Sequence, residues 1–373
     1  MRIGVVTTSY PRGPDDGAGV FVADRVAVLL AAGHDVDVLA AAGAGAPGVS
    51  EVMTPTGSRL TITRLAARIG AAPDLFARAG APEALELGTV DGWLAALRFA
   101  VALAAEVRSR AGRWSVIESH WLAPSALVVT GAAPDLPHTA TAHSGDIALL
   151  ERVPFGRSMA RVLVASGARL VFVSEDLRRR FAVLAGSTSG SVEALPVPRG
   201  FFAGARPDVD LRASLGVAGP TVVGVGRLVP IKGFDLLVRA CAPRHVGEAR
   251  IRLALVGEGP ERDRLRRLAE GLDVDLHLPG HVSRDEVGAW LRAADLYAQP
   301  SRVLPNGRTE GLPLATLEAL ATGLPAVVSN SGGLAELAGR SPELRVVPSG
   351  DVFALASALR HGLGLPDPFV TSV

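Results

Sequence analysis

Short apolar runs alternate with longer amphipathic segments along most of the chain. The first run, Ile3 to Thr8, precedes a loop rich in proline, glycine and aspartate, and a helical pattern then extends from Gly17 to Leu30. An apolar run of this length is typical of a strand that is buried on both faces of a parallel sheet. Gly33 ends the helical pattern, and Asp35 to Ala40 is predicted to be the next strand.

The alternation continues in two successive series. In the first series we predict further strands at 114–118, 137–142, 169–173 and 192–197, and helices at 92–110, 155–166 and 175–185. In the second series we predict strands at 221–225, 251–256, 274–278, 295–299, 325–329 and 344–347, with helices that begin near 233, 260, 284, 313, 333 and 352. The segment 59–90 lacks this regularity. The pattern therefore predicts an α/β protein with two doubly wound, Rossmann-like domains that face each other across a central cleft.

The boundary between these domains is predicted near residue 200. A chain of 373 residues exceeds the usual size of a single hydrophobic core, so two domains are expected. The segment PVPRGFFAG and the polar residues that follow it, up to Leu215, are typical of a linker. We therefore assign residues 1–200 to an N-terminal domain and residues 201–373 to a C-terminal domain.

The composition argues against several classes of protein. Hydrophobic residues make up 48% of the chain, charged residues 20%, and the net charge is +1, so nothing indicates a nucleic-acid-binding protein. The most apolar long helix, at 92–107, contains Arg98 and Glu106 and is not expected to cross a membrane. The N-terminus enters a strand directly, without the features of a signal peptide, which favours a cytoplasmic protein. Cys241 is the single cysteine and is expected in the core, which excludes a cysteine-based zinc site.

Arginine supplies almost all of the positive charge, and the chain contains one lysine, Lys232. This lysine lies in GRLVPIKGF, after the predicted strand 221–225, and Arg227 precedes it in the same loop. A guanidinium fork and a compact ammonium charge at the end of a buried strand are suited to the oxygens of a diphosphate. A surface salt bridge is the alternative, and the isolation of the lysine disfavours it.

The start of the helix near residue 313 is a second feature suited to an anion. Pro313 fits the first position of a helix, and Gly323 fits its end. The backbone N–H groups of Leu312, Leu314 and Ala315, together with the positive end of the helix dipole, would form a site for phosphate. If this helix end faces the loop of the lysine, charge that develops on a departing diphosphate is neutralised from both sides.

Two carboxylates flank this predicted anion site. Glu310 lies in the loop before the helix, and Glu318 lies eight residues later, within the helix. A carboxylate beside an anion site is electrostatically unfavourable unless it binds another group, and hydroxyls are the natural candidates. We interpret the pair as holding two sugar rings, one on each side of a diphosphate. The alternative is that both are solvated charges at a helix end.

The N-terminal half contains fewer indications of chemistry. Gly19, in the loop before the first helix, favours a close approach of backbone to ligand, although Val22 replaces the third glycine of a dinucleotide-binding fingerprint. His120 and His143 each follow a predicted strand, at the edge where open α/β sheets bind ligands. For His143 we predict a role in the site, and a histidine that caps a loop is the alternative.

The irregular segment 59–90 contains four arginines among apolar residues. They are Arg59, Arg64, Arg68 and Arg78. Such arginines could line an acceptor site or touch an anionic membrane surface. A solvated face that covers apolar surface with the arginine stems is the alternative.

Several motifs resemble those of one enzyme family. In the second half these are GRLVPIKG, LALVGEGPER, PGHVSRDEV and EGLPLATLEALATGLPAVVSNSGGLAEL. In the first half they are the glycine loop at 17–19, GHDVDVL, SHWLAPSA, TAHSGDI and VSEDLRRRF. Together they resemble the motifs of GT-B glycosyltransferases, specifically the retaining enzymes of glycosyltransferase family 4 (glycosyl transferases group 1). The resemblance covers most of the chain, and the combined C-terminal set is highly specific.

The resemblance implies transfer of a sugar from a nucleoside-diphosphate sugar, a UDP- or GDP-sugar, to a hydroxyl acceptor that is a glycan, a glycolipid or a small molecule. The anomeric configuration would be retained, a donor phosphate oxygen would help to take the acceptor's proton, and no metal or cofactor would be required. The N-terminal domain would bind the acceptor and the C-terminal domain the donor. The enzyme would be a monomer or weak homodimer in the cytoplasm, with peripheral membrane contact through its N-terminal domain.

The resemblance also implies a role for individual residues at matching positions. The donor diphosphate would be bound by Gly19, Arg227, Lys232, Leu314 and Ala315. The donor sugar would be bound by His143, Glu310, Gly311 and Leu312, the ribose by Glu318 and the nucleobase by Val282. The residues expected to act in catalysis are His143, Glu310, Arg227 and Lys232.

The sequence departs from the family pattern in three places. The junction PVPRGFFAG lacks the usual asparagine-glycine turn, and Ser144 stands between His143 and Gly145. The chain ends soon after the predicted helix at 352–361, so we expect the helix that usually crosses back onto the N-terminal domain to be shortened or missing.

The sequence also bears on four other functions. A sugar-nucleotide epimerase on the same frame and a non-catalytic sugar-nucleotide-binding protein remain as alternatives. A nicotinamide-dependent oxidoreductase needs a complete glycine fingerprint, and Val229 stands where the last glycine after Gly224 and Gly226 belongs. A phosphorylase needs a lysine for its pyridoxal phosphate, and the motif around Lys232 indicates phosphate binding instead.

Overall fold

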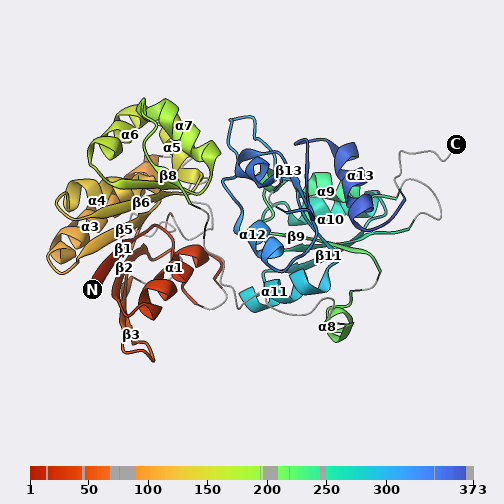
Figure 1. Ribbon diagram of the computed structural model, residues 1–373, viewed down its shortest axis with the longest axis horizontal. Coiled ribbons are helices and arrows are strands. Elements are labelled where there is room, and N and C mark those ends of the chain that lie inside the picture. Colours follow the sequence, from red (N-terminus) through yellow and green to blue (C-terminus); the bar gives the residue numbers. More distant parts are fainter. Residues whose placement is uncertain are drawn as a thin grey trace. The chain divides into compact units, whose positions relative to one another are not determined.

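The computed structural model describes residues 1–13, 16–43, 47–67, 75, 90–193, 195, 209–217, 219–243, 249–339 and 341–366. The chain divides into two compact units, Met1–Pro196 and Val197–Val373, and each unit is built on one sheet (Figure 1). The division lies close to the boundary predicted at residue 200. The first part of the predicted linker, 196–208, lies outside the described residues.

The described part of the N-terminal unit contains an eight-stranded sheet in the order β3-β4-β2-β1-β5-β6-β7-β8. Its strands are β1 (Arg2–Val6), β2 (Asp35–Ala41), β3 (Gly48–Met53), β4 (Arg59–Leu65), β5 (Val116–His120), β6 (His138–Ala142), β7 (Arg169–Phe172) and β8 (Ser191–Val192). Neighbouring strands are parallel except β3 and β4, which pair antiparallel. This confirms the predicted doubly wound arrangement of the first half.

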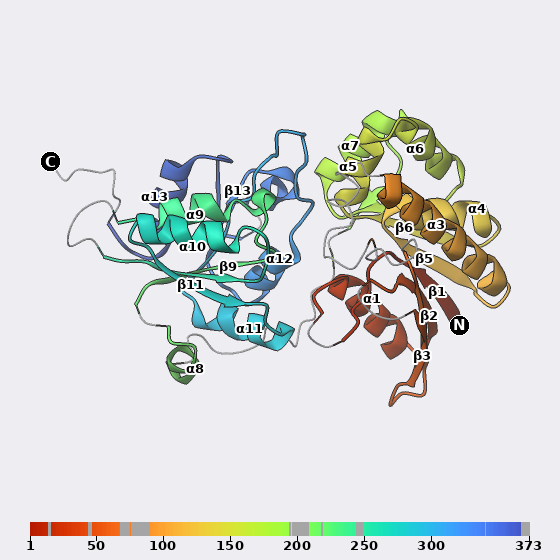
Figure 2. The same ribbon diagram turned by 180° about the vertical axis from the view of Figure 1, so that it is seen from behind.

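Helices cover both faces of this sheet. They are α1 (Val20–Ala31), α3 (Val90–Ala111), the π-helical turn η1 (Leu122–Ala126), α4 (Leu127–Ala132), α5 (Gly145–Arg152), α6 (Gly156–Ala165) and α7 (Glu175–Ala185), as Figure 2 shows from behind. Alternate residues of β2 pack against different helices: Val38 and Ala40 join the cluster of α1, whereas Leu39 and Ala41 join that of α3. A strand covered on both faces needs an apolar residue at every position, which explains the continuous apolar run.

Several elements of the N-terminal unit were not predicted from the sequence. The sequence of segment 59–90 lacks a regular pattern, yet its beginning forms β4, which pairs with β3. Every residue of β3 is exposed at the edge of the sheet, so it has no apolar run to reveal it. Helix α5 was also missed. Of the strand predicted at 192–197, the structure assigns Val192 to β8 (Ser191–Val192), and residues 194, 196 and 197 lie outside the described residues.

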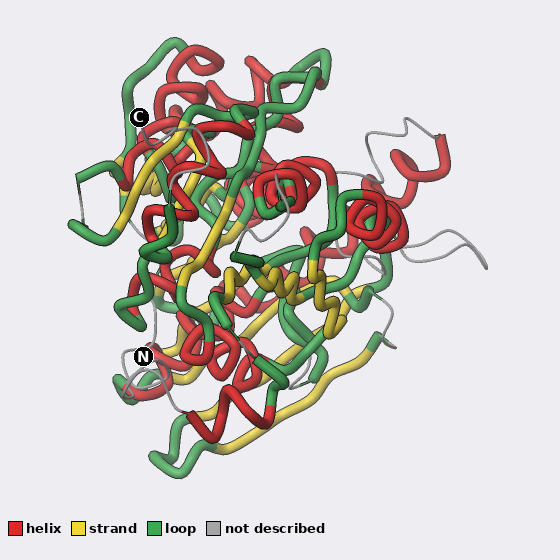
Figure 3. The backbone as a smooth tube through the Cα atoms, turned by 90° about the vertical axis from the view of Figure 1, so that its right-hand side faces the viewer, coloured by secondary structure: helices red, strands yellow, loops and turns green. Residues whose placement is uncertain are grey.

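The described part of the C-terminal unit contains a six-stranded parallel sheet in the order β11-β10-β9-β12-β13-β14. Its strands are β9 (Thr221–Val225), β10 (Arg252–Val256), β11 (Asp275–Gly280), β12 (Leu296–Gln299), β13 (Ala326–Ser329) and β14 (Leu344–Val347). All six lie within two residues of the predicted ranges. Helices and strands alternate along the chain as in the first unit, and Figure 3 shows them as red and yellow segments of the backbone.

The predicted helices of this unit lie where the sequence places them, and there are two additions, a helix at Val209–Ser214 and a short turn at Pro230–Lys232. They are α8 (Val209–Ser214), the 3-10 turn η2 (Pro230–Lys232), α9 (Phe234–Ala240), α10 (Arg262–Gly271), α11 (Arg284–Ala293), α12 (Leu314–Ala321), the 3-10 turn η3 (Gly332–Leu337) and α13 (Val352–Gly362). Helix α8 falls in the segment that was predicted to be a linker. None of the described helices in either unit is both long and apolar enough to span a membrane.

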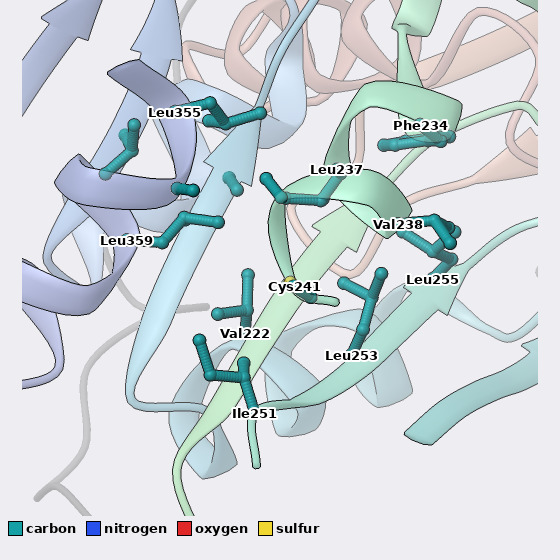
Figure 4. Packing of buried hydrophobic residues seen from close by; sticks show 14 of the residues in the cluster. Val222, Phe234, Leu237, Val238, Cys241, Ile251, Leu253, Leu255, Leu355 and Leu359 are labelled. Atoms are coloured by element: carbon teal, nitrogen blue, oxygen red, sulfur yellow. The ribbon is translucent and has the colours of Figure 1, made fainter. Parts of the chain in front are cut away.

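One of the two cores of the C-terminal unit lies between the sheet and the helices α9 and α13 (Figure 4). Val222 of β9 and Leu253 of β10 face Leu237 of α9 and Leu359 of α13 in this cluster. Cys241 is buried here, as predicted, and its burial raises the pKa of the thiol to about 12. A thiol that stays protonated at neutral pH serves as a small apolar side chain.

Candidate functional site

Two glycines hold Lys232 at the end of β9. A β-carbon on Gly226, whose φ is 146°, would lie 2.9 Å from Cε of Lys232, so the lysine side chain folds back over this glycine. Gly233 has a φ of 68°, and a β-carbon there would lie 2.0 Å from the carbonyl oxygen of Pro300. Only glycine fits such a turn without a shift of the backbone. Lys232 is therefore fixed between the ends of β9 and β12.

Arg227 lies in the same loop, which is attached to the loop after β10. The backbone N–H of Gly226 donates to the carbonyl of Val256 at 2.9 Å, and that of Leu228 donates to the carbonyl of Glu258 at 2.9 Å. Arg227 itself is half-buried. The structure thus places Arg227 and Lys232 in one ordered loop at the carboxyl edge of the sheet, as predicted from their spacing.

Glu310 binds this loop directly. Nζ of Lys232 lies 2.6 Å from Oε1 of Glu310, and the two side chains are 13% and 14% exposed. The other carboxylate oxygen of Glu310, Oε2, accepts a hydrogen bond from Oγ of Ser301. The loop before α12 and the loop after β9, more than seventy residues apart in the sequence, therefore meet at this ion pair.

The start of α12 differs by one residue from the prediction. Pro313 is the residue before the helix, with φ −60° and ψ 126°, and Leu314 is the first helical residue. The N–H of Thr316 donates to the carbonyl of Pro313 at 3.1 Å. The N–H groups of Leu314 and Ala315 precede any helical acceptor, so this helix end keeps the character of an anion site.

The loop before α12 is held close to the turn η3. A β-carbon on Gly332, whose φ is 54°, would lie 2.0 Å from the carbonyl oxygen of Glu310. Gly311 and Leu312 are buried, and Leu312 belongs to the core on the side of the sheet that carries α11. Gly332, the first glycine of SNSGG, therefore has a structural reason: it lets the backbone of the Glu310 loop approach.

Glu318 is buried on α12 and is not a solvated charge. Its side chain is 6% exposed, and Oε1 accepts a hydrogen bond from Nη2 of Arg284 at 3.1 Å. Arg284 is the first residue of α11 and was not singled out from the sequence, although it lies within the motif PGHVSRDEV. Val282, two residues earlier, is half-buried against the same core as Leu312. Glu318 and Val282 are thus placed on neighbouring elements.

His143 lies in an aromatic cluster of the N-terminal unit. Its Nε2 is 3.1 Å from Nδ1 of His120, so one of these nitrogens donates to the other. The ring of Phe21 lies 4.4 Å from the His143 ring, and the ring of Trp121 lies 5.0 Å away, centroid to centroid. Burial lowers the pKa of His120 to about 4 and that of His143 well below its ordinary value. Both imidazoles are therefore neutral at pH 7.

Asp146 fixes the loop that carries His143. Its carboxylate accepts from the backbone N–H of Leu122 at 2.7 Å and from that of His143 at 3.0 Å. Burial raises the pKa of Asp146 to about 6, although these backbone donors act in the opposite direction. Ser144 has a φ of 60°, which a residue with a side chain rarely adopts. The inserted serine noted in the sequence is thus a point of backbone strain beside His143.

Gly19 precedes α1 with a φ of 73°. A β-carbon there would lie 2.2 Å from the carbonyl oxygen of Ser9, so the fold of the loop itself requires glycine. A role of Gly19 at the donor phosphates stays a prediction.

The arginines of 59–90 have different environments. Arg59 lies 3.2 Å from Glu51 on the exposed edge of the sheet. Arg64 donates to the backbone carbonyls of Tyr10 at 3.1 Å and Pro11 at 2.5 Å, so it holds the loop after β1 rather than a solvated surface. Arg68 and Arg78 lie outside the described residues.

Each unit matches a protein-family model. Residues 16–196 match the model described as Glycosyltransferase Family 4, and residues 219–364 match the model described as Glycosyl transferases group 1. A GDP-mannose-dependent alpha-(1-6)-phosphatidylinositol monomannoside mannosyltransferase of Mycobacterium tuberculosis is 37% identical over 219 residues, which cover 56% of this chain and 55% of that protein. The chain therefore spans about half the length of the curated relatives it matches.

Solved structures match over almost the whole chain. Sucrose-phosphate synthase from Thermosynechococcus elongatus is similar with a TM-score of 0.72 and 22% identity, over 97% of this chain and 90% of that one. The Anabaena protein HepE, in complex with UDP and glucose, is similar with a TM-score of 0.66 and 21% identity, over 97% of this chain and 89% of that one. These likenesses establish the GT-B fold. With two successive family matches, the chain belongs to glycosyltransferase family 4, the glycosyl transferases group 1.

Proposed function

We propose that this protein is a retaining glycosyltransferase that moves a sugar from a nucleoside-diphosphate sugar to a hydroxyl acceptor. The observation that carries the proposal is the contact of Lys232 with Glu310 beside the start of α12. This contact joins the loop of Lys232 to the loop before α12, which supports a donor site with a cation for phosphate, a carboxylate for sugar hydroxyls and an anion-binding helix end. The membership in family 4 supports the same reaction. Nothing in the comparisons favours a sugar-nucleotide epimerase.

The proposed donor site uses charges that the fold already holds in place. Lys232 and Arg227 bind the diphosphate oxygens, together with the N–H groups of Leu314 and Ala315. As the bond between the anomeric carbon and the diphosphate breaks, the leaving oxygens gain negative charge, which these groups stabilise. The acceptor oxygen bonds to the anomeric carbon from the same face, and its proton passes to a phosphate oxygen of the donor.

The remaining residues orient the donor. Glu310, with the amides of Gly311 and Leu312, binds hydroxyls of the transferred sugar, and Glu318 binds the ribose. The buried pair of Glu318 and Arg284 supports this role, because the neighbouring guanidinium fixes the orientation of the carboxylate. Val282 contacts the nucleobase through its backbone.

His143 and Gly19 are proposed to complete the site from the N-terminal unit. Since burial keeps His143 neutral at pH 7, it serves as a hydrogen-bonding group for the donor sugar rather than as a cation. The mechanism assigns no step to a metal or cofactor, so addition of a chelator should leave the rate of transfer unchanged.

The donor is proposed to be a UDP- or GDP-sugar. The mycobacterial relative is named for GDP-mannose, and the Anabaena structure holds UDP and glucose. Thermal-shift measurements with UDP, GDP and other nucleoside diphosphates would identify the base, because a ligand raises the melting temperature according to its affinity. The nucleotide sugars of that base would follow, with NMR of the product to show the anomeric configuration.

Lys232→Ala tests the proposal most directly. Loss of a charged hydrogen bond of ~1.5–3 kcal/mol should weaken nucleoside diphosphate binding about 10-fold or more in calorimetry. Arg239→Ala is the matched control, because Arg239 is an exposed cation on α9, the helix that follows Lys232. Unchanged affinity of the Lys232 variant, or an equal loss in both variants, would contradict the assigned role.

We also propose that the N-terminal unit contacts an anionic membrane surface through α3. Its exposed side chains include apolar residues spaced along one helical face, namely Val90, Trp93, Leu94, Leu97 and Val101. Arg98 and Arg108 are exposed on the same helix. An apolar stripe with tryptophan and nearby arginines is typical of helices that lie at the surface of anionic lipid bilayers. Since the mycobacterial relative is named for a phosphatidylinositol mannoside, a lipid acceptor fits this surface.

Sedimentation with vesicles tests this contact. The protein should sediment with vesicles that contain phosphatidylinositol and less with vesicles of phosphatidylcholine alone, and Leu97→Glu should reduce the bound fraction. Val183→Glu on α7 is the control, because Val183 is an exposed valine of the same unit outside α3. Equal sedimentation of the three proteins would refute the contact through α3.

A further inference from the structure

An unbroken chain of side-chain hydrogen bonds runs from α12 to Glu310 inside the C-terminal unit. Oγ1 of Thr316 lies 3.2 Å from the hydroxyl of Tyr297, and this hydroxyl lies 3.0 Å from Oε1 of Gln299. Nε2 of Gln299 donates to Oγ of Ser301 at 2.9 Å, and Ser301 donates to Oε2 of Glu310. The first four of these residues are completely buried. Glu310 is the member of the chain that also contacts Lys232.

The carboxylate at one end fixes the direction of every bond. An ionised Glu310 can only accept, so Ser301 must donate its single proton to it. The hydroxyl oxygen of Ser301 then accepts from the amide of Gln299, which fixes the orientation of that amide and presents its oxygen to Tyr297. Tyr297 donates to this oxygen and accepts from Thr316. Each hydroxyl in this series therefore donates in one direction only, and reversing any of the hydrogen bonds would leave one of these groups without a partner.

The chain of hydrogen bonds also reaches the backbone of Lys232. Nε2 of Gln299 lies 3.5 Å from the carbonyl oxygen of Lys232, at the outer limit of a hydrogen bond. Lys232 and Ser301 therefore take one oxygen each of Glu310, and Gln299 is adjacent to both. When Lys232 binds a phosphate, the hydrogen bond from Ser301 still fixes the orientation of the Glu310 carboxylate.

We infer that Ser301 is a positioning residue for Glu310: its hydroxyl, oriented by Gln299, sets the carboxylate for recognition of the transferred sugar. The inference rests on the proposed function, because it requires Glu310 to bind the sugar. Ser301 touches neither donor nor acceptor in this assignment. Its effect should appear in the part of the donor affinity that depends on the sugar, and in the rate of transfer.

The test compares Ser301→Ala and Ser301→Cys with the parent protein. Calorimetry measures the affinity of the nucleoside diphosphate and of its nucleotide sugar, and their ratio isolates the contribution of the sugar. For Ser301→Ala we expect this ratio and kcat to fall about 10-fold, with the affinity of the nucleoside diphosphate within about 2-fold of the parent. Ser301→Cys keeps a weaker donor and should give an intermediate loss.

Ser329→Ala is the matched control. Ser329 is equally buried, and its hydroxyl donates to the backbone carbonyl of Ser301 without contact to Glu310. Removal of this hydroxyl should lower the melting temperature as much as Ser301→Ala does, yet leave the ratio and kcat close to the parent values. A variant that merely loosens the fold would weaken both ligands together, and such a result would overturn the inference.

Two results tell failure of the inference about Ser301 apart from failure of the proposed function. If Lys232→Ala does not weaken nucleoside diphosphate binding, the donor site itself is wrongly assigned. If Lys232→Ala weakens it but Ser301→Ala leaves the sugar-dependent ratio and kcat unchanged, the site stands and the role of Ser301 is refuted.

Discussion

Gly233 and Gly323 allow the packing beside Lys232 to be measured against a control in the same unit. Both glycines have a left-handed backbone conformation, with φ values of 68° and 70°. A β-carbon on Gly323 would meet nothing within 4 Å, whereas one on Gly233 would lie 2.0 Å from the carbonyl oxygen of Pro300. Alanine at either position therefore carries the same backbone strain, and only Gly233→Ala adds a collision with backbone.

The two contributions can be estimated separately. A β-carbon on a residue in the left-handed conformation destabilises the folded state by ~1–2 kcal/mol. The alanine variant also has a less flexible unfolded chain, which raises the free energy of unfolding by ~0.4–1 kcal/mol. Gly323→Ala should therefore lower the free energy of unfolding by about 1 kcal/mol. The collision at Gly233 resembles overpacking of a core, which costs a further ~1–3 kcal/mol. Gly233→Ala should then lower the free energy of unfolding by about 2–4 kcal/mol.

Scanning calorimetry of the full chain would measure both variants. Because the backbone at Gly233 must move to relieve the collision, Gly233→Ala should also weaken nucleoside diphosphate binding through the adjacent Lys232. Gly323→Ala lies at the far end of α12 and should bind normally. Equal melting temperatures of the two variants, or normal binding by a destabilised Gly233 variant, would refute the reasoning.

Two further predictions concern charged and titrating groups. Glu318→Ala should spare the fold but weaken binding of the nucleoside by about 10-fold, as one charged hydrogen bond is lost, and equal affinity for mutant and parent in calorimetry would contradict it. The free energy of unfolding should fall as the pH is lowered from 6.5 to about 4. In this range the histidines of the unfolded chain bind protons, whereas the buried His120 and His143 of the folded chain stay neutral. His120 alone should lower the free energy of unfolding by about 3 kcal/mol. Asp146, whose pKa burial raises to about 6, acts in the opposite direction, because the folded state binds its proton below that pH. It is one group against three, since burial also lowers the pKa of His138 to about 4. Urea unfolding across this range should show the loss, and a pH-independent stability would contradict it.

The strands of both sheets could be predicted from the sequence because most are covered on both faces. A covered strand such as β9, buried at all five positions, leaves a continuous apolar run that can be read without coordinates. The edge strand β3 has no such run, since each of its residues is exposed. Its pairing with β4 depends on backbone hydrogen bonds, to which side-chain pattern contributes little.

The candidate donor residues could also be selected from the sequence, but their partners could not. Lys232 was evident as the one lysine of the chain, and Glu310 and Glu318 from their position around a predicted helix start. The contact of Lys232 with Glu310 joins loops far apart in the sequence, and that of Arg284 with Glu318 joins two helices. Such distances are set by the order of strands in the sheet.

What the sequence determined by itself was local: which segments form the covered strands and most of the helices, about where they end, and which residues lie at the carboxyl edges of those strands. Only the tertiary structure decided which of these edge residues touch, as with His120 and His143, or Ser301 and Glu310. The physical reason is that periodicity and capping act over a few neighbouring residues, whereas a buried hydrogen bond or ion pair forms between whichever groups the packed sheet brings together.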